Sequence, residues 1–116
     1  MSTDDTYNGW RNRETWALNL WLTNDQGLCG MVRERIRQGK AALACYWSES
    51  GRECPADNFR QQAGQDIKDF WNELTDPDEQ LMSAENILAM VRDVGSDYRV
   101  DWDEVGAWWL SDLADE

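Results

Sequence analysis

The chain has 116 residues, a formal net charge of −12 and eight tryptophans. This length favours one domain over two, because a chain of this size buries roughly two thirds of its unfolded surface in a single core. The acidic balance disfavours direct binding to nucleic acid or membrane surfaces, and it favours a partner protein with a positively charged groove.

The first residues are acidic where an export signal needs a basic segment followed by an apolar run, so we expect no such signal. The longest apolar stretch, WALNLWL, is interrupted by Asn19 and is shorter than the roughly 20 residues that span a bilayer. Three cysteines without CxxC spacing indicate reduced thiols. These features predict a cytoplasmic protein. The sequence leaves the oligomeric state open, and a monomer is favoured. Cys54 precedes a proline and a predicted helix start, where a thiol can have a depressed pKa, but a structural thiol is the favoured interpretation.

Residues 1–11 are predicted to form a loop, and Asn12 is placed to cap the helix that follows, with Glu14 in its first turn. This helix carries apolar side chains on two sides: Trp16, Ala17, Leu20 and Trp21 on one, Leu18 and Leu22 on the other. A helix that is apolar on both sides belongs in the middle of a fold. We therefore interpret its aromatic side chains as core.

Gly27 and Gly30 bracket the start of a second helical pattern, which Gly39 is expected to end. Residues 41–47 predict a separate short helix, and residues 48–55 predict a loop. Pro55 suits the first position of a third helix. Its apolar positions fall within one stripe, namely Phe59, Ala63, Ile67, Phe70, Trp71 and Leu74. Asp76 and Pro77 are expected to end it, because proline cannot continue the backbone hydrogen bonds.

Leu81, Ile87, Leu88 and Val91 predict a fourth helix up to Gly95, and residues 96–100 permit an extended segment. Asp101 and Glu104 resemble a capping box for a last helix, with Val100 packed onto Val105. The predicted fold is all-α, a single compact domain of about five helices with a tryptophan-rich core. The side chains expected to be largely buried are Trp16, Leu20, Trp21, Phe59, Ile67, Phe70, Trp71, Trp102 and Trp109.

The sequence gives little support to catalysis. It has no histidine, which removes the commonest general base and most zinc sites, and it has no phosphate-binding glycine loop. Carboxylate pairs are abundant, but in a chain with 23 acidic residues each pair is weak evidence for a site. We expect no enzyme, no metal site and no cofactor, and we rank a carboxylate–metal enzyme third among the functional hypotheses.

The acidic residues are segregated along the chain. Residues 1–48 hold six basic and five acidic side chains, whereas residues 49–116 hold five basic and eighteen acidic ones, a net charge of −13. On the third predicted helix, one stripe is formed by Asp66, Asp69, Glu73 and Asp76, which we call the acidic row. Its members rise by about 4.5–6 Å from one to the next. Duplex DNA carries one charge per about 1.7 Å of axis, so a row of carboxylates can imitate phosphates.

Several acids lie where a helix end disfavours them. Acids near the C-terminal end of a helix each cost about 0.3–1 kcal/mol, so stability alone does not explain their position. Solubility of a tryptophan-rich domain is the simpler explanation for any one of them. The predicted partner-binding surface consists of Asp66, Asp69, Glu73, Asp76, Asp78, Glu79, Asp112, Asp115 and Glu116. The basic residues Arg33, Arg35, Arg37 and Lys40 are expected to form ion pairs within the protein and not to bind nucleic acid.

The run YNGWRNRETWALNLWL, Tyr7 to Leu22, resembles a signature of small proteins of phages, plasmids and prokaryotic genomes, of the form YNGWxNxETWxxxLWL. The matching positions include Asn8, Gly9, Trp10, Asn12, Glu14, Thr15, Trp16, Leu20 and Trp21. This resemblance implies a genomic setting and supplies no catalytic residues. Small acidic helical proteins of phages and mobile elements are similar, as a class, to anti-restriction and anti-CRISPR inhibitors, several of which imitate DNA.

The leading hypothesis is an inhibitor of a host defence nuclease, an anti-CRISPR protein that occupies a DNA-binding surface of a CRISPR–Cas effector. A restriction enzyme with a basic DNA-binding groove is the corresponding alternative target. The rival hypothesis from another class is an adaptor or regulatory domain that binds another protein through an apolar groove.

Overall fold

The computed structural model describes residues 7, 9–76 and 83–114. Within these ranges the chain forms five α-helices and one 3₁₀ helix, and it contains no strand. In chain order they are α1 (Arg13–Asn24), α2 (Gln26–Glu49), α3 (Ala56–Leu74), α4 (Ala84–Val94), η1 (Asp97–Arg99) and α5 (Trp102–Ala114). The predicted all-α fold is confirmed, and the helices form a single domain.

Helix α1 begins as the sequence predicts, since the side chain of Asn12 accepts a hydrogen bond from the backbone N–H of Thr15 at 2.9 Å. Its buried apolar side chains are Ala17, Leu18 and Leu22. The prediction that Leu20 belongs to the core is wrong, because 36% of this residue is exposed. With apolar residues on two sides, the pattern did not indicate which side faces the other helices.

Helix α2 is longer than predicted. Asp25 caps it by accepting from the N–H of Leu28 at 3.1 Å, and the helix continues through Gly39 and residues 41–47 to Glu49. Gly39 therefore does not end a helix, and no separate short helix follows it. The reason lies in the packing: a Cβ atom on Gly39 would collide with the carboxylate of Asp66 on α3. The glycine makes room for a neighbouring side chain.

Helices α3 and α4 begin and end close to the predicted residues. Pro55 directly precedes α3, which stops at Leu74, before Pro77. Ser83 caps α4 through the N–H of Asn86, and α4 ends at Gly95, whose φ of 81° suits a residue without a side chain. The following segment is the 3₁₀ helix η1 and not an extended strand.

Helix α5 has half of the predicted capping box. The side chain of Asp101 accepts from the N–H of Glu104 at 3.1 Å. The carboxylate of Glu104 instead accepts from the backbone N–H of Arg11 at 2.9 Å and so connects the N-terminal loop to α5. Val100 and Val105 are both buried.

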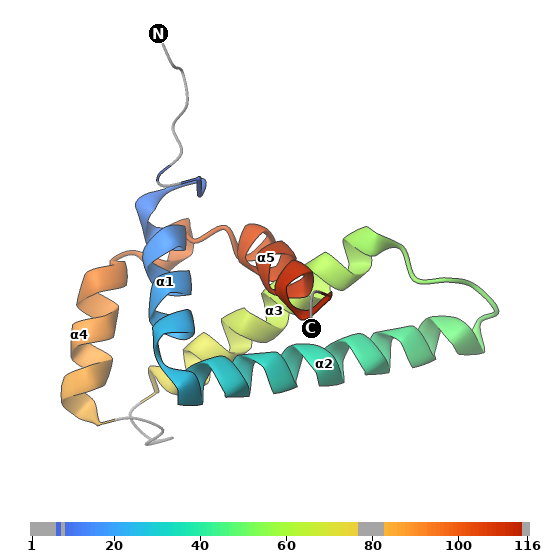
Figure 1. Cartoon of the computed structure of the whole chain (residues 1–116), viewed down its shortest axis with the longest axis horizontal. Coiled ribbons are helices and arrows are strands. Elements are labelled where there is room, and N and C mark those ends of the chain that lie inside the picture. Colours follow the sequence, from blue (N-terminus) through green and yellow to red (C-terminus); the bar gives the residue numbers. More distant parts are fainter. Residues whose placement is uncertain (1–6, 8, 77–82, 115–116) are drawn as a thin grey trace, which may run out of the picture.

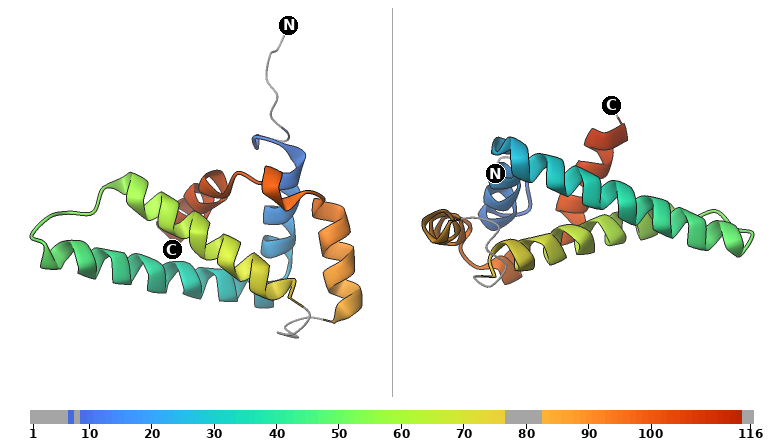
Figure 2. Two further views of the ribbon diagram at one scale, coloured as in Figure 1. Left: turned by 180° about the vertical axis from the view of Figure 1, so that it is seen from behind. Right: turned by 90° about the horizontal axis from the view of Figure 1, so that it is seen from below.

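The helices form two groups (Figure 1). In the first group, α2 and α3 make a long antiparallel hairpin, and α5 lies across α3. In the second group, α1 and α4 pair side by side, at the end of the molecule opposite the loop that joins α2 to α3. The other views in Figure 2 show the same arrangement. Helices α3 and α5 cross at Gly64 and Gly106, where a Cβ atom on Gly64 would lie 2.6 Å from the carbonyl oxygen of Trp102. This close crossing holds α5 against the hairpin.

The predicted aromatic core is confirmed in part. Ile67, Phe70, Trp71 and Trp109 are almost fully buried. The tryptophans Trp16, Trp21 and Trp102 are only half-buried and pack at the edge of this core, and Phe59 is also half-buried. Large rings at the edge of a small domain bury one face and leave the other near solvent.

Candidate functional site

The acidic row lies along the C-terminal part of α3, beside the basic residues of α2. Helices α2 and α3 run antiparallel, so Arg35 and Gly39 of α2 lie next to Glu73 and Asp66 of α3. Asp66 and Glu73, two of the four members of the row, therefore lie next to the neighbouring helix.

Glu73 forms an ion pair with Arg35 across the two helices. The guanidinium of Arg35 also lies over the ring of Phe70, with its central carbon 5.1 Å from the ring centre. A cation held between a carboxylate and an aromatic ring contributes to helix packing. This ion pair offsets part of the charge that Glu73, whose side chain is 43% exposed, presents to a partner.

Asp66 occupies a partly enclosed position. One carboxylate oxygen accepts from Gln62 Nε2 at 2.9 Å, and the other is enclosed without a hydrogen-bond partner among the described residues. Burial raises the pKa of Asp66 above its ordinary value, the negative charge of Asp69 adds to the shift, and the Gln62 hydrogen bond and Arg35 oppose it. Asp66 is thus poorly placed to meet a partner.

Asp69 is the most exposed member of the acidic row. Its side chain is exposed and accepts a hydrogen bond from Gln65 Nε2 at 2.9 Å. Asp76 is half-buried just beyond the end of α3. The outer surface of this helix is otherwise rich in uncharged amides, namely Asn58, Gln61, Gln62, Gln65 and Asn72.

Of the remaining predicted site residues, Asp112 lies within the described part of the chain. Asp112 of α5 forms an ion pair with Arg33 of α2 at 2.9 Å. Asp78, Glu79, Asp115 and Glu116 lie outside the described residues. The prediction of internal ion pairs for the basic cluster is confirmed for Arg33 and Arg35, while Lys40 lies over the ring of Phe59 at 5.9 Å.

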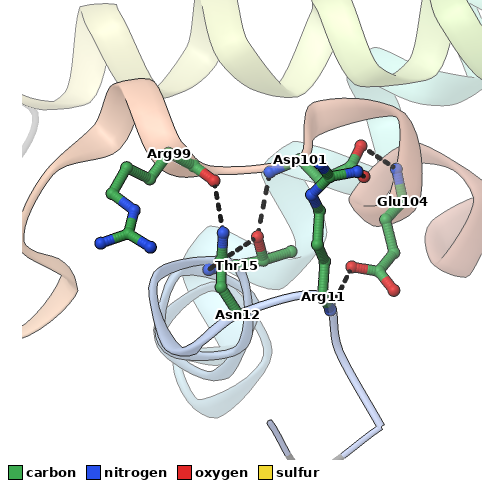
Figure 3. A network of polar contacts seen from close by, with 6 residues as sticks. All are labelled: Arg11, Asn12, Thr15, Arg99, Asp101 and Glu104. Carbon is green, nitrogen blue, oxygen red and sulfur yellow. Dashed lines mark hydrogen bonds and ion pairs between the residues drawn. The ribbon is translucent and has the colours of Figure 1, made fainter. Parts of the chain in front are cut away.

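The polar residues of the N-terminal segment have structural roles (Figure 3). Asn12 donates from Nδ2 to the carbonyl oxygen of Arg99 at 2.7 Å, and Thr15 Oγ1 accepts from the N–H of Asp101 at 2.9 Å. One helical turn after Thr15, Asn19 accepts from the indole N–H of buried Trp109 at 2.7 Å. These bonds fasten the start of α1 to η1 and α5, more than eighty residues away in the chain.

A model of DUF7249, a family of unknown function, matches residues 3–107. The chain belongs to this family. Neither the comparison with curated proteins nor the comparison with solved structures found a match. The match spans nearly all of the described DUF7249 fold, including the N-terminal segment and the acidic row.

The DUF7249 chain also carries a surface aromatic cluster, formed by Tyr7, Trp10, Trp16 and Trp108. The sequence did not predict it, and the aromatic side chains of α1 were interpreted as core. Tyr7 and Trp10 pair through two backbone hydrogen bonds of 2.6 and 2.8 Å. The ring of Tyr7 lies 5.0 Å from that of Trp16, and the ring of Trp10 lies 6.3 Å from that of Trp108. Tyr7 is 41% exposed and Trp108 is 39% exposed. No linear pattern brings residue 10 next to residue 108, so only the fold reveals this cluster.

A hollow of about 570 Å³ at the end of the hairpin is lined partly by Phe59 and Cys54, and partial burial raises the pKa of the Cys54 thiol. A raised pKa leaves less of the reactive thiolate, in line with a structural thiol. In the part of the chain that the structure describes, no cluster of three potential ligands is arranged to hold a metal ion. No described helix combines the length and the apolar character of a membrane span.

Proposed function

We propose that the protein is a non-catalytic inhibitor, encoded by a phage or mobile element, that binds a host defence nuclease in the cytoplasm as a monomer. Specifically, we propose an anti-CRISPR protein that covers a DNA-binding surface of a CRISPR–Cas effector complex. The observation that carries this proposal is the segregation of charge, with a net −13 in residues 49–116. A DNA-binding groove must be basic, so it is the surface that such a charge distribution complements best.

The proposed mechanism is occupation of lysine and arginine sites that otherwise hold phosphates. Long-range attraction between opposite charges speeds association, and added salt screens it. Short contacts between carboxylates and guanidinium groups then fix the orientation of the two proteins. Inhibition by this route is stoichiometric and consumes no substrate.

The ion pairs described above narrow the contact residues. Glu73 and Asp112 each pair with an arginine of α2, so part of their charge is already compensated within the molecule. Asp69 is exposed and faces no arginine of α2 in the ion pairs of the described residues. We therefore propose that Asp69, and not the whole acidic row, is the member of α3 that meets the partner.

A panel of purified CRISPR–Cas effector complexes and restriction enzymes tests the proposal. Each is mixed with the protein at increasing molar ratio, and binding to its target DNA is measured by mobility shift. We expect at least one complex to lose DNA binding at about equimolar inhibitor. Undiminished DNA binding by the whole panel would favour an adaptor function instead.

Two charge-reversal variants test whether inhibition depends on where the negative charge lies or only on the total charge. Asp69→Lys and Glu49→Lys change the net charge equally, but Glu49 ends α2 at the far tip of the hairpin. Both side chains are exposed, so each exchange should change stability by less than about 0.5 kcal/mol. We expect Asp69→Lys to weaken inhibition much more than Glu49→Lys. Equal effects would mean that total charge, and not the α3 surface, determines binding.

A further inference from the structure

The exposed rings of the surface aromatic cluster are not needed to hold the N-terminal segment in place. The polar residues Asn12, Thr15 and Asn19 already fasten the N-terminal segment to the rest of the fold. Tyr7 and Trp108 nevertheless leave about two fifths of their surface in solvent, at 41% and 39%. Exposed tyrosine and tryptophan on rigid backbone are the residues that most often supply the central contacts of protein interfaces.

The cluster is also held in place before any partner arrives. Two backbone hydrogen bonds pair Tyr7 with Trp10, and the N–H of Arg11 donates to Glu104 of α5. Trp108 packs edge-on against buried Trp109, with ring centres 5.3 Å apart. Rings that are already ordered lose little conformational entropy on binding.

Carboxylates flank the exposed indole on α5. Glu104, Trp108 and Asp112 recur every four residues, so they lie along one side of the helix with the indole between the two acids. Glu104 accepts one bond from the backbone of Arg11, and Asp112 accepts one from Arg33. A carboxylate has about four acceptor positions, so each has capacity for a further donor.

We propose that this cluster docks an arginine of a basic partner protein, with the guanidinium stacked on Trp108 and bonded to Glu104. The charge of the molecule selects a cationic partner, and the flat indole between carboxylates selects arginine over lysine, because guanidinium stacks on aromatic rings and donates in a planar fork. The same chemistry occurs inside the fold, where Arg35 lies over Phe70 and pairs with Glu73. This inference rests on the proposed function, because it assumes a basic partner. It adds the surface aromatic cluster as a second contact region, outside α3.

The test uses octa-arginine and octa-lysine peptides as probes, titrated into ¹⁵N-labelled protein. We expect the indole N–H signals of Trp10 and Trp108 to shift saturably with octa-arginine. Octa-arginine should bind more tightly than octa-lysine by about two- to fivefold, the range of an exposed cation–π contact. Trp108→Ala should abolish this preference for arginine. Tyr46→Ala, which removes a 69% exposed tyrosine from α2, is the matched control and should retain it.

Glu104→Gln provides a variant that keeps the acceptor for Arg11 and removes only the charge, so the fold should survive. We expect it to weaken octa-arginine binding while the melting temperature stays unchanged. Shifts confined to α3, with the arginine preference intact in Trp108→Ala, would overturn the inference and leave the proposed function standing. No binding of either peptide anywhere would count against both. If oligodeoxythymidine shifts the signals of the same indoles saturably, the cluster stacks on bases and the arginine inference is overturned. If these signals shift with protein concentration in the absence of any probe, the cluster mediates self-association and the inference is likewise overturned.

Discussion

Asp66 shows how a single side chain can differ from what its place in a pattern suggests. By helical spacing it belongs to a solvent-facing row of acids, yet its carboxylate lies against the backbone of α2 at Gly39. Burial removes water from the charged form and raises the pKa of the group. The folded state therefore holds the proton of Asp66 more tightly than the unfolded chain does.

The consequence for stability follows from the direction of this shift. A carboxyl group with a raised pKa in the folded state contributes stability below its ordinary pKa of 3.8, and this contribution is lost as the pH rises through the folded pKa. The variant Asp66→Asn cannot ionise, so it does not lose this stability at high pH, and its amide oxygen still accepts the hydrogen bond from Gln62. We expect the variant to melt above the unaltered protein at pH 7, with the difference disappearing as the pH falls below 3.8. Thermal scans across this pH range measure it, and a variant that melts lower at pH 7 would show that the charge of Asp66 is needed.

Asn19 provides the second test at the scale of one residue. It is 5% exposed and accepts from the indole of Trp109, which is fully buried. Asn19→Ala leaves that N–H without a partner, a change that costs about 1–3 kcal/mol. Urea unfolding should show a loss of this size, whereas Asn72→Ala on the exposed side of α3 should change stability little. Equal behaviour of the two variants would contradict the structural role assigned to Asn19.

At the scale of the helices, glycines determine how closely the elements approach. A Cβ atom on Gly106 would lie 2.7 Å from the carbonyl oxygen of Arg60, against backbone that cannot move aside. By contrast, a Cβ atom on Gly30 of α2 would meet nothing within 4 Å. Replacement by alanine is therefore expected to have opposite effects on stability at Gly106 and at Gly30.

We expect Gly106→Ala to destabilise the protein by about 1–3 kcal/mol, the usual cost of overpacking. Gly30→Ala should stabilise it by up to about 1 kcal/mol, because alanine is the better helix former. Circular dichroism during urea unfolding measures both free energies. If Gly106→Ala were neutral, the close crossing of α3 and α5 would be wrong.

The helices illustrate what the sequence determines and what it does not. Caps at Asn12 and Asp101 and the apolar stripe of α3 are local signals, and they predicted where these helices begin and what they bury. Gly39 was misinterpreted because its reason to be glycine is Asp66, a residue 27 positions later. The aromatic cluster was missed for the same reason, since Trp10 and Trp108 meet only after α5 has packed.

For the whole molecule, the charge balance was readable from sequence, but its distribution on the surface was not. A net −13 in residues 49–116 does not reveal that Arg33 and Arg35 reach across to Asp112 and Glu73. These pairs reduce the acidic row to a smaller exposed part centred on Asp69. Attraction of a basic partner then depends on the electrostatic field of the whole molecule, and contacts with individual residues add to its affinity and specificity.

The most direct test of this account is competition with DNA for the effector complex that the protein inhibits. Affinity of the unaltered protein for that complex is measured by biolayer interferometry, with and without target DNA already bound, at low and high salt. We expect bound DNA to exclude the protein, and the affinity to fall steeply as salt rises, because screening weakens attraction between exposed charges. Binding that is insensitive to salt and coexists with bound DNA would contradict the claim that the protein occupies a DNA-binding surface.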